Sequence, residues 1–206
     1  MGRRTDLALS RESIARAALA ILDEGGAAAV TLRNIATRLG VRSPSLYNHV
    51  TSKDDILDAV TELIGREIDE SPLADPDLRR GLTGFARSYR QAFRQHPDAL
   101  AVIAQRAVET DVALAAYDTA IGRLQREGWH PVAAFETMAA LEYIVLGSAL
   151  VPFTRGFIRS PAEYADRYPA LARSLSAAEL DAVDDRGFEL ALDLFLDALI
   201  ARGPAS

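Results

Sequence analysis

Apolar residues recur at helical spacing along almost the entire chain, and no segment shows the strict alternation of a half-buried strand. The first helical segment places its apolar residues at intervals of three and four: Ile14, Ala17, Ala18, Ile21 and Leu22. Ser10 is a suitable N-cap for this helix, and the Gly25-Gly26 pair ends it. Composition agrees, because Ala and Leu are abundant while β-branched and aromatic residues are sparse. The sequence therefore predicts an all-α fold.

The clearest break in the chain is the segment Ser71–Asp77, which contains two prolines. Before it, short helices are expected over about 32–39, 43–50 and 53–70, the first capped by Thr31 and the last by Ser52. After it, helices are expected at roughly 77–95, 98–107, 110–127, 131–154, 161–173 and 184–202. Residues 154–183 are the least regular part and are expected to form a loop. We place the domain boundary at the break, with one domain over 1–70 and another over 71–206.

Charge is distributed unevenly along the chain. Residues 1–53 carry eight Lys and Arg against four Asp and Glu, a net charge of +4, whereas the remaining 153 residues carry 15 against 25, a net charge of −10. A basic head on an acidic body is typical of a small polyanion-binding module joined to a larger part that does not bind polyanions. Chance clustering of the charges is the alternative, and charge alone does not decide between them.

The segment from Val30 to Val50 has the spacing of a helix-turn-helix. Ala36 supplies the small residue needed where two helices cross, and Gly40, four positions later, supplies a turn residue that tolerates left-handed geometry. Apolar residues on both sides of the turn are spaced to bring the helices together: Ile35, Leu39, Val41 and Leu46. The segment therefore predicts a helix that enters the major groove of DNA.

The polar residues of the third helix and its neighbours are the candidate DNA contacts. Arg42 suits guanine O6 and N7, and Ser45 and Asn48 can reach other base edges. Tyr47 and His49 are better interpreted as phosphate contacts. The starts of neighbouring helices also favour phosphate, which adds two residues to the prediction: Thr31 and Lys53.

The same segment closely resembles the TetR family of transcriptional repressors. The matching residues are Thr31-x-Arg33-x-Ile35-Ala36-x-x-Leu39-Gly40-Val41, followed by Ser45-Leu46-Tyr47-x-His49-Val50-x-x-Lys53-x-x-Leu57. The resemblance covers about residues 10–65. It implies a homodimer with a three-helix DNA-binding head and a larger body that binds a small molecule and dimerises through its last long helices. By position it assigns DNA contact to Arg33, Arg42, Ser43, Pro44, Ser45, Tyr47, His49 and Lys53.

The body resembles the tetracycline-repressor branch more loosely, at Tyr89–His96 and Tyr143–Ser148. In an ungapped comparison, the histidine and glutamate that help hold drug-bound magnesium in that branch fall near Ile103 and Val151. Neither side chain can ligate Mg²⁺, which prefers oxygen ligands. We therefore expect no metal site and no cofactor, and an effector other than tetracycline with magnesium.

Eight body residues are candidates to line an apolar pocket with one or two polar anchors, and thus to bind an apolar or aromatic effector. They are Tyr89, Phe93, Tyr117, Trp129, Phe135, Met138, Glu142 and Phe153. Each also suits an ordinary core position. The last helix is apolar around more than half of its circumference, which fits a dimer bundle as well as a monomer core.

The sequence predicts a DNA-binding transcriptional regulator, interpreted as a repressor that a small molecule releases from a palindromic operator. An enzyme is the alternative from another class, but no serine elbow, metal-ligand spacing or phosphate loop is present. A regulator without an effector is the third interpretation, and a filled body core would favour it. Activation in place of repression also stays open.

Location in the cell is predicted from the apolar segments. Residues 1–10 contain Arg3 and Arg4 without the apolar run of a signal peptide, and the chain has no cysteine. The longest apolar run, Tyr143–Phe153, is too short to cross a bilayer. We expect a cytoplasmic protein with no membrane partner.

Overall fold

Helices make up all the regular structure in the part of the chain that the computed structural model describes, residues 9–204. The all-α prediction is confirmed. The head contains α1 (Arg11–Ala29), α2 (Leu32–Leu39), α3 (Ser43–Leu46) and α4 (Lys53–Gly65). The body contains η1 (Ser71–Ala74), α5 (Leu78–Arg94), α6 (Pro97–Ile103), α7 (Asp111–Arg126), α8 (Pro131–Leu150), η2 (Phe153–Gly156), α9 (Pro161–Tyr164), α10 (Pro169–Ala177) and α11 (Leu180–Arg202).

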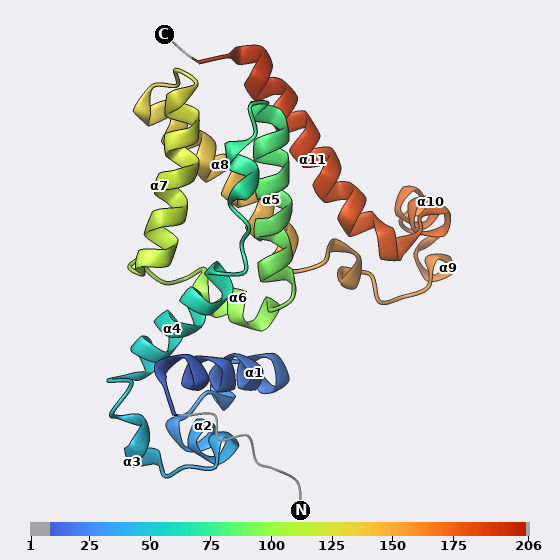
Figure 1. Ribbon diagram of the computed structural model, residues 1–206. Helices are drawn as coiled ribbons and strands as arrows, with labels where there is room; N and C mark the ends of the chain where they lie inside the picture. The colour runs from blue at the N-terminus through green and yellow to red at the C-terminus, as the bar shows by residue number, and fades with distance from the viewer. Residues whose placement is uncertain (1–8, 205–206) are drawn as a thin grey trace, which may run out of the picture.

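Three of the four head helices, α1, α2 and α4, begin where the sequence predicts, because a side chain caps each of them; α3 begins with a proline in its first turn instead. Ser10, Thr31 and Ser52 each accept a hydrogen bond from a backbone N–H of the first turn that follows. Helix α1 is kinked at Gly26, whose φ of 69° is left-handed, so the glycine pair does interrupt the regular helix there. Helix α1 packs against α4 and α6, and α2 and α3 lie at the end of the molecule farthest from the body (Figure 1).

Two head helices are shorter than expected. Helix α3 ends at Leu46, not Val50, because Tyr47 N donates to Pro44 O and His49 N to Leu46 O, and these i→i−3 bonds tighten the chain into a turn. Helix α4 ends at Gly65, not Glu70. The chain turns away there toward α5, where Ser88 Oγ accepts a hydrogen bond from Asp69 N at 2.7 Å.

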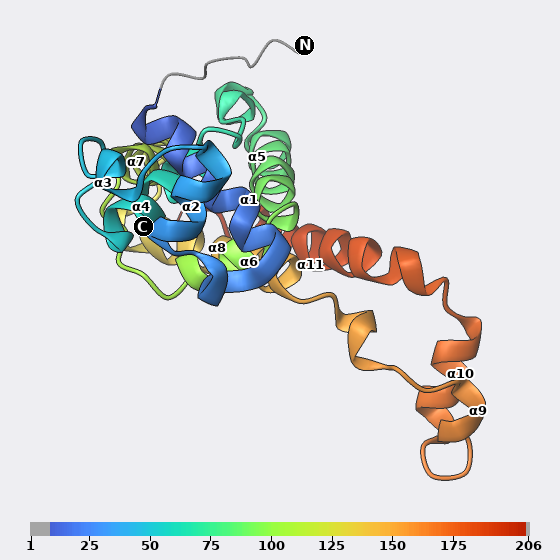
Figure 2. The ribbon, with the colours of Figure 1, turned by 90° about the horizontal axis from the view of Figure 1, so that it is seen from below.

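Residues 154–183 are more regular than the predicted loop, and the helix expected at 161–173 is divided into two short helices. They hold η2, α9 and α10, since Pro161 and Pro169 each start a short helix in the position that proline favours. Helix α8 ends at Leu150, not 154, because Val151 precedes Pro152 and is held in extended geometry. Helix α11 begins at Leu180, four residues earlier than expected. We call residues 151–179 the arm; Figures 1 and 2 show its α9 and α10 standing off from the other helices.

The body is built around α5 and α8, which pack against each other and against α6, α7 and α11. Helix α8 is long and apolar enough to cross a membrane by length and composition, with a mean hydropathy of 1.3, the one such helix among the described residues. Its apolar stretch begins well before Tyr143, because its first half is rich in Ala and also contains Val132, Phe135 and Met138. Only 33% of that stretch is buried in the single chain, so α8 presents apolar side chains that its own chain does not cover.

The linker η1 lies directly on α5, and two glycines make that approach possible. A Cβ at Gly81 would lie 2.8 Å from Pro72 O, and a Cβ at Gly84 would lie 2.7 Å from Pro72 Cβ. From the other side, Arg123 Nη2 of α7 donates to Asp75 O at 3.0 Å. The segment that joins head and body is therefore held between α5 and α7.

A Gly81→Ala variant is expected to be less stable by about 1–3 kcal/mol, although alanine is the better helix former by about 1 kcal/mol. The new methyl group would collide with backbone that cannot move without releasing η1. Gly122 in α7 provides the control, because its Cβ would meet only the flexible end of Arg126 at 3.4 Å. Gly122→Ala is expected to stabilise the protein slightly in urea denaturation. Equal effects of the two substitutions would contradict the close-approach argument.

Candidate DNA-binding face and effector cavity

The turn between α2 and α3 has the geometry that the sequence predicts. Gly40 adopts φ 71° and ψ 26°, and its N–H donates to the carbonyls that end α2. Val41 N donates to Ala36 O at 3.0 Å, which closes the turn. Ile35 and Leu46 are fully buried at the crossing of the two helices. This core fixes the direction in which the short α3 points.

The structure places the ten candidate DNA contacts on α2, on α3 with the turn that follows it, and at the start of α4. Eight are exposed and two, Ser43 and Ser45, are half-buried. Tyr47 is 57% exposed, which is unusual for an aromatic side chain. Thr31 Oγ1 accepts from Asn34 N at 3.1 Å, so its hydroxyl also caps α2.

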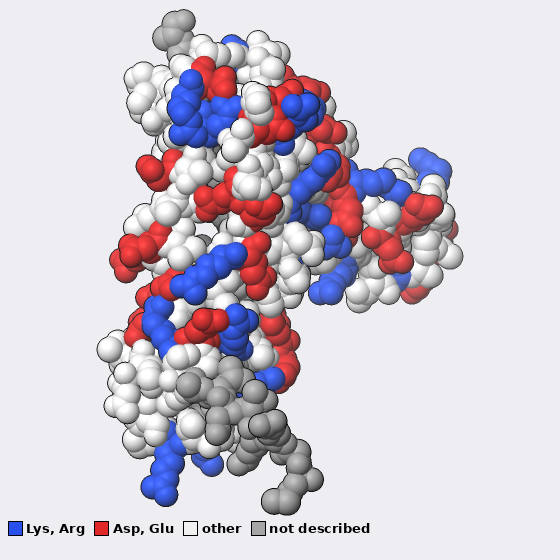
Figure 3. Space-filling model, in the orientation of Figure 1, with Lys and Arg blue, Asp and Glu red and all other residues white. Residues whose placement is uncertain are grey.

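Unpaired cations gather in the same region. Arg33, Arg42 and Lys53 have no carboxylate within ion-pair distance among the described residues. By contrast, four other arginines of the head are paired with carboxylates: Arg11, Arg16, Arg38 and Arg66. Figure 3 shows Lys and Arg side chains projecting from the lower end of the molecule, with the acidic side chains higher up. Guanidinium and ammonium groups that have no carboxylate within ion-pair distance suit phosphate binding.

Asp55 holds the start of α4 in place on α1. Its carboxylate accepts from Thr51 N at 2.8 Å and from Arg11 Nε at 3.1 Å. The backbone hydrogen bond from Thr51, followed by the contact with Arg11, lowers the pKa of Asp55 below its usual range. The carboxylate therefore stabilises the head as long as it is ionised.

An Asp55→Asn variant is expected to unfold about 1–3 kcal/mol more easily at pH 7, because the bonds to a charged acceptor are lost. Since the pKa is lowered in the folded state, the contribution is present above about pH 4 and disappears as the pH falls through the folded-state pKa. Denaturant unfolding at pH 7 and pH 3.5 should therefore show a smaller difference in stability between the two proteins at the lower pH. A difference that stays constant would rule out a charge effect.

The body contains a cavity with about 890 Å³ of empty space, its opening included. Phe85, Tyr89 and Phe93 of α5 form an aromatic wall, with neighbouring ring centroids 5.9 and 5.4 Å apart. Five of the eight predicted effector residues line the cavity: Tyr89, Phe93, Tyr117, Met138 and Glu142. A mainly apolar cavity of this size with a few polar groups is typical of small-molecule sites.

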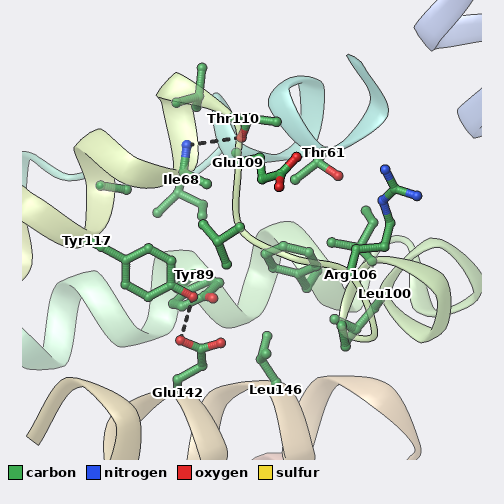
Figure 4. A pocket seen from close by; sticks show the side chains of 18 of the residues that line it. Thr61, Ile68, Tyr89, Leu100, Arg106, Glu109, Thr110, Tyr117, Glu142 and Leu146 are labelled. Carbon is green, nitrogen blue, oxygen red and sulfur yellow. Dashed lines mark hydrogen bonds between the residues drawn. The ribbon is translucent and has the colours of Figure 1, made fainter. Parts of the chain in front are cut away.

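A short hydrogen bond lies at one side of this cavity. Tyr117 Oη donates to Glu142 Oε2 at 2.6 Å, beside the ring of Tyr89 (Figure 4). Burial first, and the nearby carboxylate second, raise the pKa of Tyr117 above its ordinary value of 10. Burial likewise raises the pKa of Tyr89. Both phenols therefore stay protonated at neutral pH.

The other three predicted effector residues lie outside the cavity. Trp129 is buried after the end of α7, where its backbone N–H donates to Leu124 O at 3.2 Å. Phe135 is 65% exposed on the outer face of α8. Phe153 is 68% exposed at the start of the arm, and its ring packs edge-on against Phe157 at 5.1 Å. These residues were candidates because they are large and apolar, but the sequence does not indicate which face of the body borders the cavity.

Sequence reasoning missed the cavity wall contributed by α4 and by residues 104–110. From α4 and its end come Asp58, Thr61, Gly65 and Ile68, and from the loop come Arg106, Glu109 and Thr110. These segments are brought together by the packing of head on body, and no local pattern indicates it. Ile103 also lines the cavity, whereas Val151 lies in the arm and does not. Among the described residues, no three His, Asp or Glu side chains are grouped to hold a metal ion.

Known protein families match both the head and the body of this chain. Residues 14–60 match the model of the bacterial regulatory proteins of the tetR family, and residues 71–202 match that of the tetracyclin repressor-like C-terminal domain. The class A tetracycline repressor of Escherichia coli, from transposon 1721, is 31% identical over 94% of this chain and 92% of its own. An HTH-type transcriptional regulator of Saccharopolyspora erythraea is 29% identical over 86% of this chain and 74% of its own.

Solved structures show the same fold over nearly the full length. A possible TetR-family regulator of Streptomyces coelicolor has a TM-score of 0.77 at 26% identity and covers 93% of this chain and 99% of its own. A Q116A variant of TetR from Acinetobacter baumannii, in complex with minocycline, has a TM-score of 0.72 at 27% identity and covers 97% and 100%. The chain therefore belongs to the TetR family of bacterial regulatory proteins, as the helix-turn-helix segment predicted.

Proposed function

We propose that this DNA-binding transcriptional regulator is a repressor, and that a small apolar or aromatic molecule in the body cavity releases it from a near-palindromic operator. The observation that carries the proposal is that α4 belongs to both sites. Its start follows the candidate DNA-binding turn, and its later residues, Asp58 to Gly65, line the cavity. A ligand that fits one position of α4 better than another would shift the head between two arrangements.

Related structures support an aromatic effector. One is described as TetR in complex with minocycline, and another as ActR of Streptomyces coelicolor in complex with actinorhodin, the latter at 24% identity. For this chain we propose neither compound. The apolar Ile103 in the cavity wall, and the absence of a group of metal-ligating residues among those described, speak against a drug held through magnesium. The cavity itself argues against a regulator without an effector.

We propose ten DNA contacts: Thr31, Arg33, Arg42, Ser43, Pro44, Ser45, Tyr47, Asn48, His49 and Lys53. We propose five effector contacts: Tyr89, Phe93, Tyr117, Met138 and Glu142. The proposed domains are 1–70 for DNA binding and 71–206 for effector binding and dimerisation. The effector site then takes part of its wall from the first domain. As a regulator of transcription the protein would act in the cytoplasm, and it is not proposed to be an enzyme.

A homodimer is proposed because α8 and α11 present apolar side chains that the single chain leaves uncovered. Val132, Phe135 and Tyr143 lie along one face of α8, and Leu190 and Leu194 lie along one face of α11; all five are exposed. A two-fold arrangement would bury both faces against their copies and would set two recognition segments about one DNA turn or slightly more apart.

Arg106 is positioned to transmit the presence of a ligand to the head. It lines the cavity, and its guanidinium pairs with Asp54 at 2.7 Å and with Asp58 at 2.8 Å, both on α4. An Arg106→Met variant is expected to bind operator nearly as well as the wild type. The fold-change in operator affinity caused by a releasing compound should fall by about five- to ten-fold, within the usual range of coupling energies. Fluorescence anisotropy with labelled operator measures both quantities.

Arg87→Met is the matched control for that variant. Arg87 pairs with Glu189 at 2.6 Å, within the body and away from α4. Its loss should leave the response to the compound unchanged. An Arg106→Met protein that responds as strongly as the wild type would show that the coupling runs through other contacts.

The test of the function is binding to the DNA immediately upstream of the protein's own gene, titrated with salt. The proposal expects tight binding that weakens steeply as salt rises, since phosphate contacts release counterions. A screen of aromatic compounds on that complex should then find one that releases it. Binding no tighter than to random DNA, both there and in a genome-wide selection, would contradict the proposed function.

A further inference from the structure

The cavity carries an uncompensated negative charge. Its wall contains three carboxylates, Asp58, Glu109 and Glu142, and one cationic side chain, Arg106. That guanidinium already pairs with Asp58 and with Asp54, a residue just outside the wall. Glu109 and Glu142 have no cationic partner within 4 Å in the part of the chain that the structure describes. Two carboxylates of the cavity wall, Glu109 and Glu142, are therefore not balanced by a positive charge from the wall itself.

Glu142 occupies the decisive position, because it lies among the aromatic rings. One carboxylate oxygen accepts the hydrogen bond from Tyr117, while Oε1 has no donor among residues 9–204. Oε1 is also not sealed in the core, since no fully buried side-chain oxygen or nitrogen in that range lacks a partner. An accessible carboxylate oxygen beside aromatic rings is a partner for a cation, which an aromatic face also attracts.

Glu109 lies across the cavity from Glu142, on the exposed loop before α7 (Figure 4). A cation approaching through this side meets Glu109 first and the carboxylate of Glu142 at the opposite wall. An anionic ligand would meet repulsion at both places, and Arg106 would have to give up its pairs with α4 to accept it. A neutral ligand would leave Glu142 partly desolvated without a charged partner, which is unfavourable.

We propose that the effector is an aromatic cation, a molecule with a protonated or quaternary nitrogen on an apolar ring system, and that its charge pairs with Glu142. This inference rests on the proposed function in taking the cavity as the effector site. It goes further by naming the charge of the ligand and the residue that selects it. The aromatic wall of α5 holds the rings, and Tyr117 holds the Glu142 side chain toward them.

The charge preference is tested without DNA, by titrating the protein with three acridines that share one tricyclic frame. The probes are 9-aminoacridine, a cation at pH 8, neutral acridine, and the anion acridine-9-carboxylate, each followed by its own fluorescence. The wild type is expected to bind the cation at least about ten-fold more tightly than either of the others. In Glu142→Gln, which keeps an oxygen to accept from Tyr117, that preference should disappear.

Glu136→Gln is the matched control, because Glu136 is an exposed glutamate of α8 that does not line the cavity. It should bind all three probes as the wild type does, and thermal melting should show that both variants are folded. Equal or tighter binding of acridine or its carboxylate would overturn the inference. So would a cation preference that persists in Glu142→Gln, or no binding of the cation at all.

Failure of this inference differs visibly from failure of the proposed function. If a neutral aromatic compound releases the operator complex, the proposed repressor function stands and the proposed cationic effector is wrong. If the protein binds no operator but prefers 9-aminoacridine through Glu142, the proposed charge selectivity stands and the proposed repressor function is wrong. Cation binding that also weakens the operator complex supports both.

Discussion

An Arg42→Ala/Tyr47→Ala protein is expected to bind its operator about 100- to 1,000-fold more weakly than the wild type. Arg42 lies at the N-cap of α3 with no ion-pair partner among the described residues, so its guanidinium is free for a guanine edge or a phosphate. A good base contact is worth about 1–3 kcal/mol. Tyr47 adds a contact from an exposed ring, and the two losses together give the expected range.

The measurement is anisotropy with labelled operator at several salt concentrations. If Arg42 contacts a base, discrimination against random DNA should shrink, and if it contacts phosphate, the salt dependence should become shallower. Arg16→Ala is the control, because Arg16 is exposed on α1 but pairs with Glu12 at 2.7 Å. Unchanged operator affinity in the double variant would show that α3 does not contact the DNA.

A Leu194→Glu substitution is expected to convert the dimer to a monomer and to weaken operator binding by about 100- to 10,000-fold. Leu194 is 62% exposed on α11, and a two-fold contact would place a new carboxylate opposite its own copy. Without the dimer, the second half-site no longer binds at the high effective concentration that a joined partner provides. Sedimentation gives the mass, and anisotropy on full and half operators gives the affinity.

Leu114→Glu is the matched control for this substitution. Leu114 is an exposed leucine, 49% accessible, but it lies on α7 and not on the proposed interface. It should remain dimeric and bind operator normally. A Leu194→Glu protein that stays dimeric would show that the subunits meet through other surfaces, with the arm as the next candidate.

The head was predictable from the sequence because its determinants are local. Ser10, Thr31 and Ser52 cap helices whose first turns follow at once, and Gly40 supplies the left-handed turn at the position its spacing indicates. The ends of α3 and α4 were not predictable, since they depend on turns and on a hydrogen bond to Ser88 in another helix.

The cavity was only partly predictable, for a related reason. Tyr89 and Phe93 line it because they follow one face of α5, but Phe135 and Phe153 are equally apolar and face outward. Which apolar face surrounds a cavity depends on the packing of helices that are distant in sequence. The loop that carries Arg106 and Glu109 has no periodic pattern, so nothing in the sequence assigned it to the site.

The double role of α4 constrains how such proteins can be recombined. A chimera that joins this head to another body after Gly65 would bring Asp54 and Asp58 without Arg106, and would leave the foreign cavity with an α4 wall that does not fit it. Asp23 of α1 would likewise lose His96, which its carboxylate contacts at 2.8 Å. Exchange of α2 and α3 alone, between Val30 and Thr51, keeps these contacts and would change operator choice while retaining the original effector response.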